Sequence, residues 1–273
     1  MTRRDFITGG IASAGAACLS SPVRSNIGGS MTSLISSPPT PIDLPYVTDG
    51  LEAFWDGEWN IGAGMHNSST ATWVDLSGHK RHMYAPAPLW GENYAYCDGT
   101  TFNQIFRQTA QESEWFSDIV MSGRYTIEFV QSMDVARGDP MLLCDRIELN
   151  FSMRGAVINV NNSGFKIAIN QTNYVGYYTV NGINYLSKRC HQFSADRTVG
   201  TCGVNGIYAV QEANFVAQNY THGGLAIGGR GDLYGTPYYS NGLCIYRVSI
   251  YSRSLSQDEL EFNLATDVAR FGL

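Results

Sequence analysis

The sequence predicts an all-β fold, an antiparallel β-sandwich with one short helix near its C-terminal end. Short alternating or apolar runs recur about every ten residues and are separated by turn residues, a pattern typical of antiparallel sandwiches. The chain contains 29 Gly, and Asn-Gly pairs that favour tight hairpin turns begin at Asn181, Asn205 and Asn241. Charged residues make up only 15% of the chain, which excludes a coiled coil and a highly charged disordered protein.

The predicted strands follow one another along most of the chain after residue 50. They are Leu51–Trp55, Arg124–Gln131, Met141–Cys144, Ile147–Phe151, Ala156–Val160, Phe165–Ile169, Tyr174–Thr179, Cys190–Ser194, Thr198–Val204, Ile207–Gln211, Leu225–Ile227 and Leu243–Tyr251. In the segment Arg124–Gln131, apolar residues alternate with Thr126, Glu128 and Val130. Its residues Tyr125, Ile127 and Phe129 predict one face directed into the core.

One helix is predicted from a capping box near the end of the sequence. Ser256 and Glu259 have the spacing at which each side chain accepts a hydrogen bond from the other residue's backbone N–H. The helix is expected to run to about Val268. It is expected to dock through Leu260, Leu264 and Val268, which share one face at helical spacing.

Residues 1–21 resemble a twin-arginine export signal. Arg3 and Arg4 precede Asp5-Phe6-Ile7 and a weakly apolar run rich in Gly and Ala. Such signals are read by a receptor, so we expect export to the periplasm, the cell surface or the medium. The alternative is a disordered terminus with a chance pair of arginines. A lipid anchor at Cys18 is not expected, because the three residues before it match a lipoprotein box poorly.

The rest of the chain is interpreted as a linker followed by one domain. Residues 22–46 are rich in Ser, Pro and Gly and cannot bury enough apolar surface to become ordered. Residues 47–273 contain every predicted element and no internal repeat. No apolar run reaches the length of a membrane span, and the net charge of −6 argues against a nucleic-acid partner.

Five cysteines follow the predicted signal, and they are Cys97, Cys144, Cys190, Cys202 and Cys244. An odd number leaves at least one thiol outside any intramolecular disulfide. Cys190 and Cys202 flank a predicted hairpin and are candidates for a disulfide, but buried thiols are an equal alternative.

Several segments resemble laminin G-like domains of the concanavalin A-like lectin/glucanase superfamily. Leu225–Arg230 and Ile250–Ser256 are similar to the closing segment of these domains. Tyr125–Phe129 is similar to their early core strand, Gly203–Gly206 to their Val-Asn-Gly hairpin, and Trp73–Gly78 to the entry turn of bacterial members. The resemblance covers about residues 47–273. It implies a jelly-roll sandwich and leaves the function open, because this fold carries many activities.

The residues of these motifs are expected to hold the fold rather than a ligand. Arg253 is placed to donate to turn carbonyls, and Asp75 to accept from backbone N–H groups of its own turn. Trp73 and Leu76 are expected to pack in the core or at its corner. Tyr251 offers an apolar ring with one hydroxyl.

The sequence argues against glycoside hydrolysis. The superfamily includes β-glucanases, whose Glu-x-Asp-x-x-Glu strand supplies two glutamates as nucleophile and acid. In the nearest segment here, Glu148–Met153, Asn150 replaces the aspartate and Met153 replaces the second glutamate. Without a second carboxylate this strand supports neither retaining nor inverting hydrolysis, so we expect no enzyme. A divergent hydrolase with its acid and base on separate loops stays an alternative.

Binding is therefore the favoured function, with a glycan or a surface protein as partner and a structural or assembly module as the alternative. Sugars stack on aromatic faces while amides and carboxylates bond their hydroxyls. The candidate ligand-binding residues are Trp59, Asn60, Tyr177, Tyr178, Tyr234, Tyr238 and Tyr239. No cofactor is required, although Asp56, Asp139 and Asp232 are weak candidate oxygen ligands for Ca²⁺.

Overall fold

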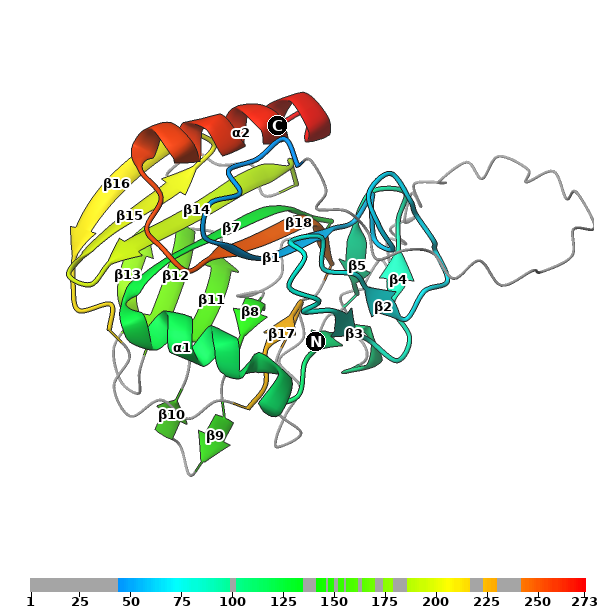
Figure 1. The fold of residues 1–273 in the computed structure, drawn as a ribbon, viewed down its shortest axis with the longest axis horizontal. Coiled ribbons are helices and arrows are strands. Elements are labelled where there is room, and N and C mark those ends of the chain that lie inside the picture. The colour runs from blue at the N-terminus through cyan, green and yellow to red at the C-terminus, as the bar shows by residue number, and fades with distance from the viewer. Residues whose placement is uncertain are drawn as a thin grey trace, which may run out of the picture. The chain divides into compact units, whose positions relative to one another are not determined.

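The computed structural model of the chain contains two antiparallel β-sheets that pack face to face (Figure 1). It describes residues 44–98, 102–134, 141–145, 147–149, 152–154, 156–161, 164–169, 174–178, 186–216, 223–229 and 242–273. The predicted all-β sandwich is confirmed. Each predicted strand matches an observed one to within two residues at either end.

The first sheet has eight strands in the spatial order β16-β15-β14-β7-β18-β5-β4, with β1 also beside β18. Their bounds are β1 Leu51–Asp56, β4 Leu89–Trp90, β5 Ala95–Cys97, β7 Arg124–Met133, β14 Arg189–Asp196, β15 Val199–Val204, β16 Ile207–Glu212 and β18 Leu243–Tyr251. β5 pairs with the start of β18 and β1 with its end. β7 and β18 consequently form the centre of this sheet, with β16 at one edge.

The second sheet also has eight strands, in the order β13-β12-β11-β8-β17-β6-β3-β2. Their bounds are β2 Thr72–Trp73, β3 Met83–Tyr84, β6 Phe106–Arg107, β8 Met141–Cys144, β11 Ala156–Asn161, β12 Gly164–Ile169, β13 Tyr174–Tyr178 and β17 Ala226–Ile227. A separate hairpin pairs β9, Ile147–Leu149, with β10, Ser152–Arg154. The short strands β2 to β6 were not predicted, because two or three residues are too few to show an alternation.

The main core lies between the sheets. From β7 it receives Tyr125, Ile127 and Phe129, which confirms the face predicted from their alternation. The opposite face of β7 is sealed as well, because Thr126 and Glu128 are completely buried. The alternation alone did not predict this second buried face, which lies under the C-terminal helix and the chain segment before β1.

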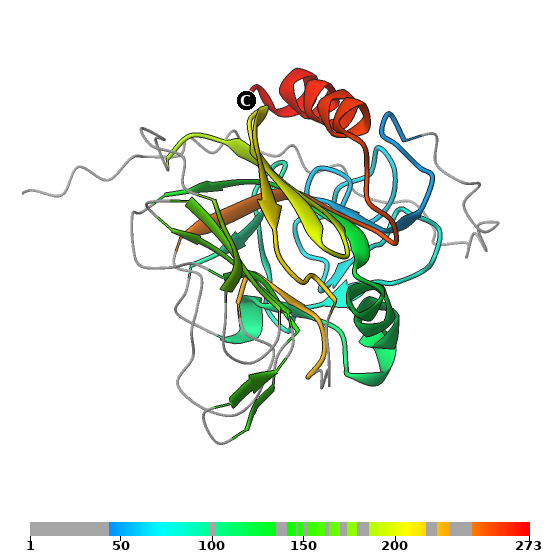
Figure 2. The same cartoon turned by 90° about the vertical axis from the view of Figure 1, so that its left-hand side faces the viewer.

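The C-terminal helix α2 spans Gln257–Phe271 and lies on the outer side of the first sheet (Figures 1 and 2). Its predicted capping box is confirmed at Ser256. The predicted docking face is partly wrong. Leu260 is buried, but Val268 is 46% exposed, because the helix is turned so that Asn263 and Asp267 face the sheet.

A second helix, α1, spans Glu114–Ser122 and was not predicted. It buries Phe116, Ile119 and Val120 in the main core and ends at Gly123, whose φ of 71° is left-handed. Two 3₁₀ turns, Phe102–Gln104 and Gln111–Ser113, precede it. Among the described residues, neither helix has the length and apolar character needed to cross a bilayer.

The motif residues hold turns, as expected from the sequence. Asp75 accepts from the backbone N–H groups of Phe54, Ser77 and Arg81, each at 2.9 Å. Arg253 Nε donates to the carbonyl oxygen of Asp49 at 3.0 Å. The remaining motif residues, Trp73, Leu76 and Tyr251, are buried.

The disulfide considered between Cys190 and Cys202 does not form, and both residues are buried free thiols. Cys202 pairs with Phe193 and belongs to the core between the sheets. Cys190 packs beside Val130 on the other side of the first sheet. The two thiols therefore point to opposite faces of the hairpin.

Candidate functional site

The outer face of the second sheet carries a row of residues that the strand register brings together. Toward the core, this sheet directs Trp73, Met83, Phe106, Leu143 and Ile227, all buried. The alternate positions form the opposite face, and they are successive Cα partners across the strands: Thr72, Tyr84, Arg107, Ala226 and Cys144. The first three reach solvent, whereas Ala226 and Cys144 are completely buried. The register thus places an aromatic residue directly beside a cation, away from the core.

Tyr84 and Arg107 are the residues of this row whose side chains suit ligand binding. The side chain of Tyr84 is 53% exposed although it belongs to a strand. Arg107 lies across from it and is half-buried, and this burial lowers the pKa of its guanidinium. An arginine stays charged at neutral pH even so. A phenol ring beside a guanidinium can stack on an apolar sugar face while donating to hydroxyl or carboxylate oxygens.

The backbone register sorts the two predicted tyrosines of β13 into different rows. Tyr177 is the Cα partner of Lys166, and Lys166 is the partner of Asn159. Tyr178 pairs instead with Phe165, which pairs with Val160. The two tyrosines therefore occupy different rows of the sheet, and ligand binding by either one stays a prediction.

The last residue of β1 and the loop that follows it include three residues predicted to bind a ligand or Ca²⁺. Asp56 is completely buried and accepts from the backbone N–H groups of Glu58 and Trp59 at 2.9 and 3.1 Å. Its other oxygen lies 2.8 Å from Arg270 of α2. Burial raises the pKa of Asp56, and the Arg270 charge opposes that change. A carboxylate already neutralised by arginine is a poor ligand for Ca²⁺.

Trp59 and Asn60 also make contacts with other residues of the chain. The guanidinium of Arg270 lies 4.1 Å from the centre of the half-buried Trp59 ring. Asn60 is completely buried, and its amide both donates to and accepts from the backbone of Asn67, at 3.0 and 2.8 Å. These are the contacts of residues that shape a loop. Ligand binding by Trp59 and Asn60 stays a prediction that their contacts do not favour.

The remaining predicted site residues lie outside the described residues. They are Tyr234, Tyr238, Tyr239, Asp139 and Asp232, together with Arg3 and Arg4 of the predicted signal. Within the part of the chain that the structure describes, no group of three or more His, Cys, Asp or Glu residues is arranged to hold a metal ion.

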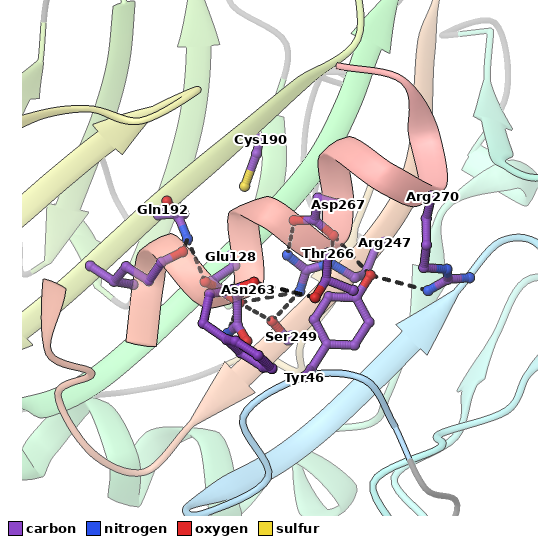
Figure 3. Close-up of polar contacts among 12 residues, drawn as sticks. Tyr46, Glu128, Cys190, Gln192, Arg247, Ser249, Asn263, Thr266, Asp267 and Arg270 are labelled. Atoms are coloured by element: carbon purple, nitrogen blue, oxygen red, sulfur yellow. Dashed lines mark hydrogen bonds and ion pairs between the residues drawn. The ribbon is translucent and has the colours of Figure 1, made fainter. Parts of the chain in front are cut away.

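A second polar cluster lies buried beneath α2 (Figure 3). Arg247 of β18 donates through Nε and Nη2 to the two carboxylate oxygens of Asp267, at 2.8 and 2.5 Å. Its Nη1 lies 3.2 Å from Glu128 of β7. All three side chains are completely buried. We call them, with the groups that satisfy Glu128, the helix network.

The oxygens of Glu128 are saturated by neutral donors in addition to Arg247. Ser249 and Asn263 donate to Oε2 at 2.9 and 3.0 Å, and Gln192 donates to Oε1 at 2.7 Å. Burial raises the pKa of Glu128, and Arg247 opposes that rise. Burial would lower the pKa of Arg247, but the carboxylates of Asp267 and Glu128 hold it well above its usual range.

The helix network also fixes the segment that enters the fold. Tyr46 donates to Asp267 Oδ1 at 2.9 Å, and the backbone N–H of Val47 donates to Asn263 Oδ1 at 2.9 Å. Leu44 and Tyr46 are buried, so the folded unit includes residues that the sequence assigned to the linker. Every donor and acceptor of the cluster is satisfied internally and shielded from water. The network therefore holds α2 and this segment on the sheet.

The segment compared with the glucanase motif is a hairpin. Glu148 lies on β9 and Met153 on β10, and the two are Cα partners across the hairpin. The predicted strand Ile147–Phe151 ends at Leu149. Glu148 and Met153 therefore lie on two paired strands and not along one continuous strand.

Sequence reasoning missed both Tyr84 and Arg107. Each belongs to a strand of two residues, and the aromatic and the cation come from separate segments of the chain. No local spacing signals their meeting. The one available signal was the pair Met83-Tyr84. Successive side chains of a strand point to opposite faces, so an apolar Met83 directed into the core leaves Tyr84 facing outward.

The comparisons with known proteins relate this chain to solved structures alone. No protein-family model matches the sequence, and no curated protein matches it. A Trypanosoma rangeli sialidase in complex with sialic acid superposes with a TM-score of 0.59 at 16% identity, covering 85% of this chain and 34% of the sialidase. The binding domain of botulinum neurotoxin DC, in complex with rat synaptotagmin II, superposes with a TM-score of 0.55 at 9% identity, covering 80% of this chain and 52% of that domain.

These similarities show the fold, an antiparallel β-sandwich of the jelly-roll type. The chain spans about a third of the sialidase and about half of the neurotoxin domain.

Proposed function

We propose that this chain is a non-catalytic binding module whose ligand is a carbohydrate. The observation that carries the proposal is the pairing of the exposed Tyr84 with Arg107 on the outer face of the second sheet. An aromatic ring held on a rigid strand offers a stacking surface at little entropic cost. The adjacent guanidinium supplies directional donors for the ligand's oxygens.

The fold supports the same proposal without establishing it. Two proteins with this architecture were solved with bound partners, one with sialic acid and one with a synaptotagmin. Because the chain matches only part of the sialidase, hydrolysis does not transfer to it. Membership of the laminin G-like domains and export through the twin-arginine pathway belong to this proposal as well, on the motifs of the sequence.

A glycan array screened with and without Ca²⁺ tests the proposal. We expect the full chain to bind a subset of glycans, and Tyr84→Ala to lose at least tenfold in affinity for them. Met65→Ala is the matched control, because Met65 is also 53% exposed but lies in the loop after β1. Failure of the full chain to bind any glycan would exclude lectin activity and favour a structural or assembly module.

The hydrolase alternative has its own test. Incubating the chain with the glycans that it binds, and with chromogenic sialosides, should release no sugar. Turnover above the uncatalysed rate that disappears on substituting a single carboxylate would instead establish an enzyme.

A further inference from the structure

Among the residues that the structure describes, the strand β16 lies at the edge of the first sheet with no strand beyond it (Figures 1 and 2). It follows β15 through the tight turn Asn205-Gly206, whose φ angles of 47° and 81° are those the Asn-Gly pair predicted. The turn makes Val204 and Ile207 a hydrogen-bonded pair, and such pairs alternate along an antiparallel hairpin. The backbone groups of Ile207, Ala209 and Gln211 therefore face β15. The bond from Ala213 N to Thr198 O, 3.0 Å long, continues this series.

The alternate residues direct their backbone groups away from the sheet. These are Tyr208, Val210 and Glu212, and within the described part of the chain their N–H and C=O groups have no partner strand. The side chain of Val210, at the middle of the strand, is 69% exposed. Folded proteins usually protect such an edge with a lysine, a proline, a bulge or a covering loop. The sequence of β16, Ile-Tyr-Ala-Val-Gln-Glu, contains no lysine or proline, and its register with β15 is unbroken.

We propose that two copies of this chain associate by antiparallel pairing of their β16 strands about a two-fold axis at Val210. In this register each Val210 lies across from its own counterpart, and each Tyr208 across from Glu212 of the second copy. All three pairs consist of residues whose backbone groups face outward, so they would exchange about six hydrogen bonds. The two first sheets would become one continuous sheet, and the isologous contact closes on itself.

Charge and shape favour a second copy as the occupant. The only charged residue of β16, Glu212, meets a tyrosine and not the other Glu212, so the pairing creates no like-charge contact. An open hollow of about 490 Å³ lies at the end of the strand, lined by Thr198, Val199, Glu212 and Ala213. The same register places Ile207 of the second copy, 59% exposed in the single chain, across from Ala213 at the wall of this hollow.

The oligomeric state of the full chain tests the pairing. Light scattering after size exclusion should give about twice the chain mass of 30.0 kDa for the natural protein. Val210→Lys places two like charges opposite each other at the axis and should return the mass to that of one chain. Val268→Lys is the matched control, since Val268 is an exposed valine on α2, and it should stay a dimer. A natural protein that is monomeric at about 100 µM, or a Val210→Lys dimer, would overturn the proposal.

A crosslink tests the register independently of stability. Val210→Cys places two thiols across a two-fold hydrogen-bonded pair, where Cα atoms lie about 5.5 Å apart and a disulfide can close. Under mild oxidation this variant should run as a covalent dimer on a non-reducing gel. Gln211→Cys, which lies across from Ala209, should not crosslink. Efficient crosslinking of both variants, or of neither, would contradict a two-fold axis at Val210.

Discussion

The helix network under α2 and the Tyr84–Arg107 pair are two polar groupings on opposite sides of the sandwich. In the first, Glu128, Arg247 and Asp267 are completely buried, and all their polar atoms are satisfied by the protein. In the second, Tyr84 is more than half exposed and Arg107 is partly so. Both groupings contain an arginine, so the residue type alone does not distinguish a grouping that stabilises the fold from one that binds a ligand. The difference that the structure shows is exposure to solvent, since the first grouping is sealed from water and the second is open to it.

The largest effect is expected from breaking the helix network. Asp267→Ala removes the bidentate partner of Arg247 and leaves a buried guanidinium with one carboxylate. We expect a loss of about 3–5 kcal/mol in the free energy of unfolding, measured by urea denaturation. The control is Asp196→Ala, which breaks the exposed pair with Arg124 on the same sheet and should cost about 0–1 kcal/mol. Equal losses for the two variants would contradict the role given to the network.

A buried histidine of the first sheet makes stability depend on pH. Burial lowers the pKa of His191 to about 3, with the charge of Arg189 acting in the same direction. Between that value and its ordinary pKa of about 6.5, the unfolded chain binds a proton that the folded chain does not. Above pH 6.5 His191 is therefore neutral in both states and does not weaken the fold. As the pH falls below 6.5, the free energy of unfolding decreases by roughly 1.4 kcal/mol per pH unit. The free energy of unfolding of the natural protein and of His191→Gln, measured by urea denaturation at pH 4.5, 5.5 and 6.5, should change with pH at rates that differ by about this amount. The same pH dependence in both proteins would refute the prediction.

A smaller effect is expected where the helix network meets the entering segment. Asn263 donates to Glu128 and Tyr251 and accepts from the backbone of Val47. Asn263→Ala should cost about 1–3 kcal/mol, because it leaves buried groups without partners. Thermal unfolding measures the loss. A variant as stable as the natural protein would show that water replaces the amide, and that α2 is less sealed than its burial indicates.

The smallest effect on stability is expected at the open pair. Tyr84→Ala removes a ring that is mostly in solvent, so unfolding should change by no more than about 0.5 kcal/mol. The same substitution is expected to abolish most glycan binding. A variant that loses both stability and binding would place Tyr84 with the structural residues and would remove the contrast between the two groupings.

The strands could be predicted because their signal is local. Alternation and Asn-Gly turns are read within ten residues, so β7, β15 and β16 appear nearly as they are in the structure. The helix α1 carried a similar signal, with Phe116 and Val120 four residues apart and Gly123 at its end, and it was nonetheless missed. Its apolar run was as compatible with irregular core structure as with a helix.

The sites could not be predicted in the same way, because they form between distant segments. The helix network joins β7, β18 and α2. Asp267 and not Val268 faces the sheet, because Arg247 of β18 lies where Asp267 can pair with it. Tyr84 meets Arg107 only through the register of two-residue strands. The aromatic and amide residues of the Asp56–Asn60 loop attracted attention in the sequence, but the structure uses them to attach the loop to itself and to α2.

The position of α2 has a consequence for how the molecule is made. Glu128 and Arg247 are separated by 119 positions, and the residues that cover them come later still, from Asn263 to Asp267. A growing chain that has not yet reached α2 leaves the outer side of β7 and β18 open to water and their charges incompletely paired. Contacts of such long range form slowly. The outer side of β7 and β18 can therefore be sealed only after the residues of α2 have been synthesised.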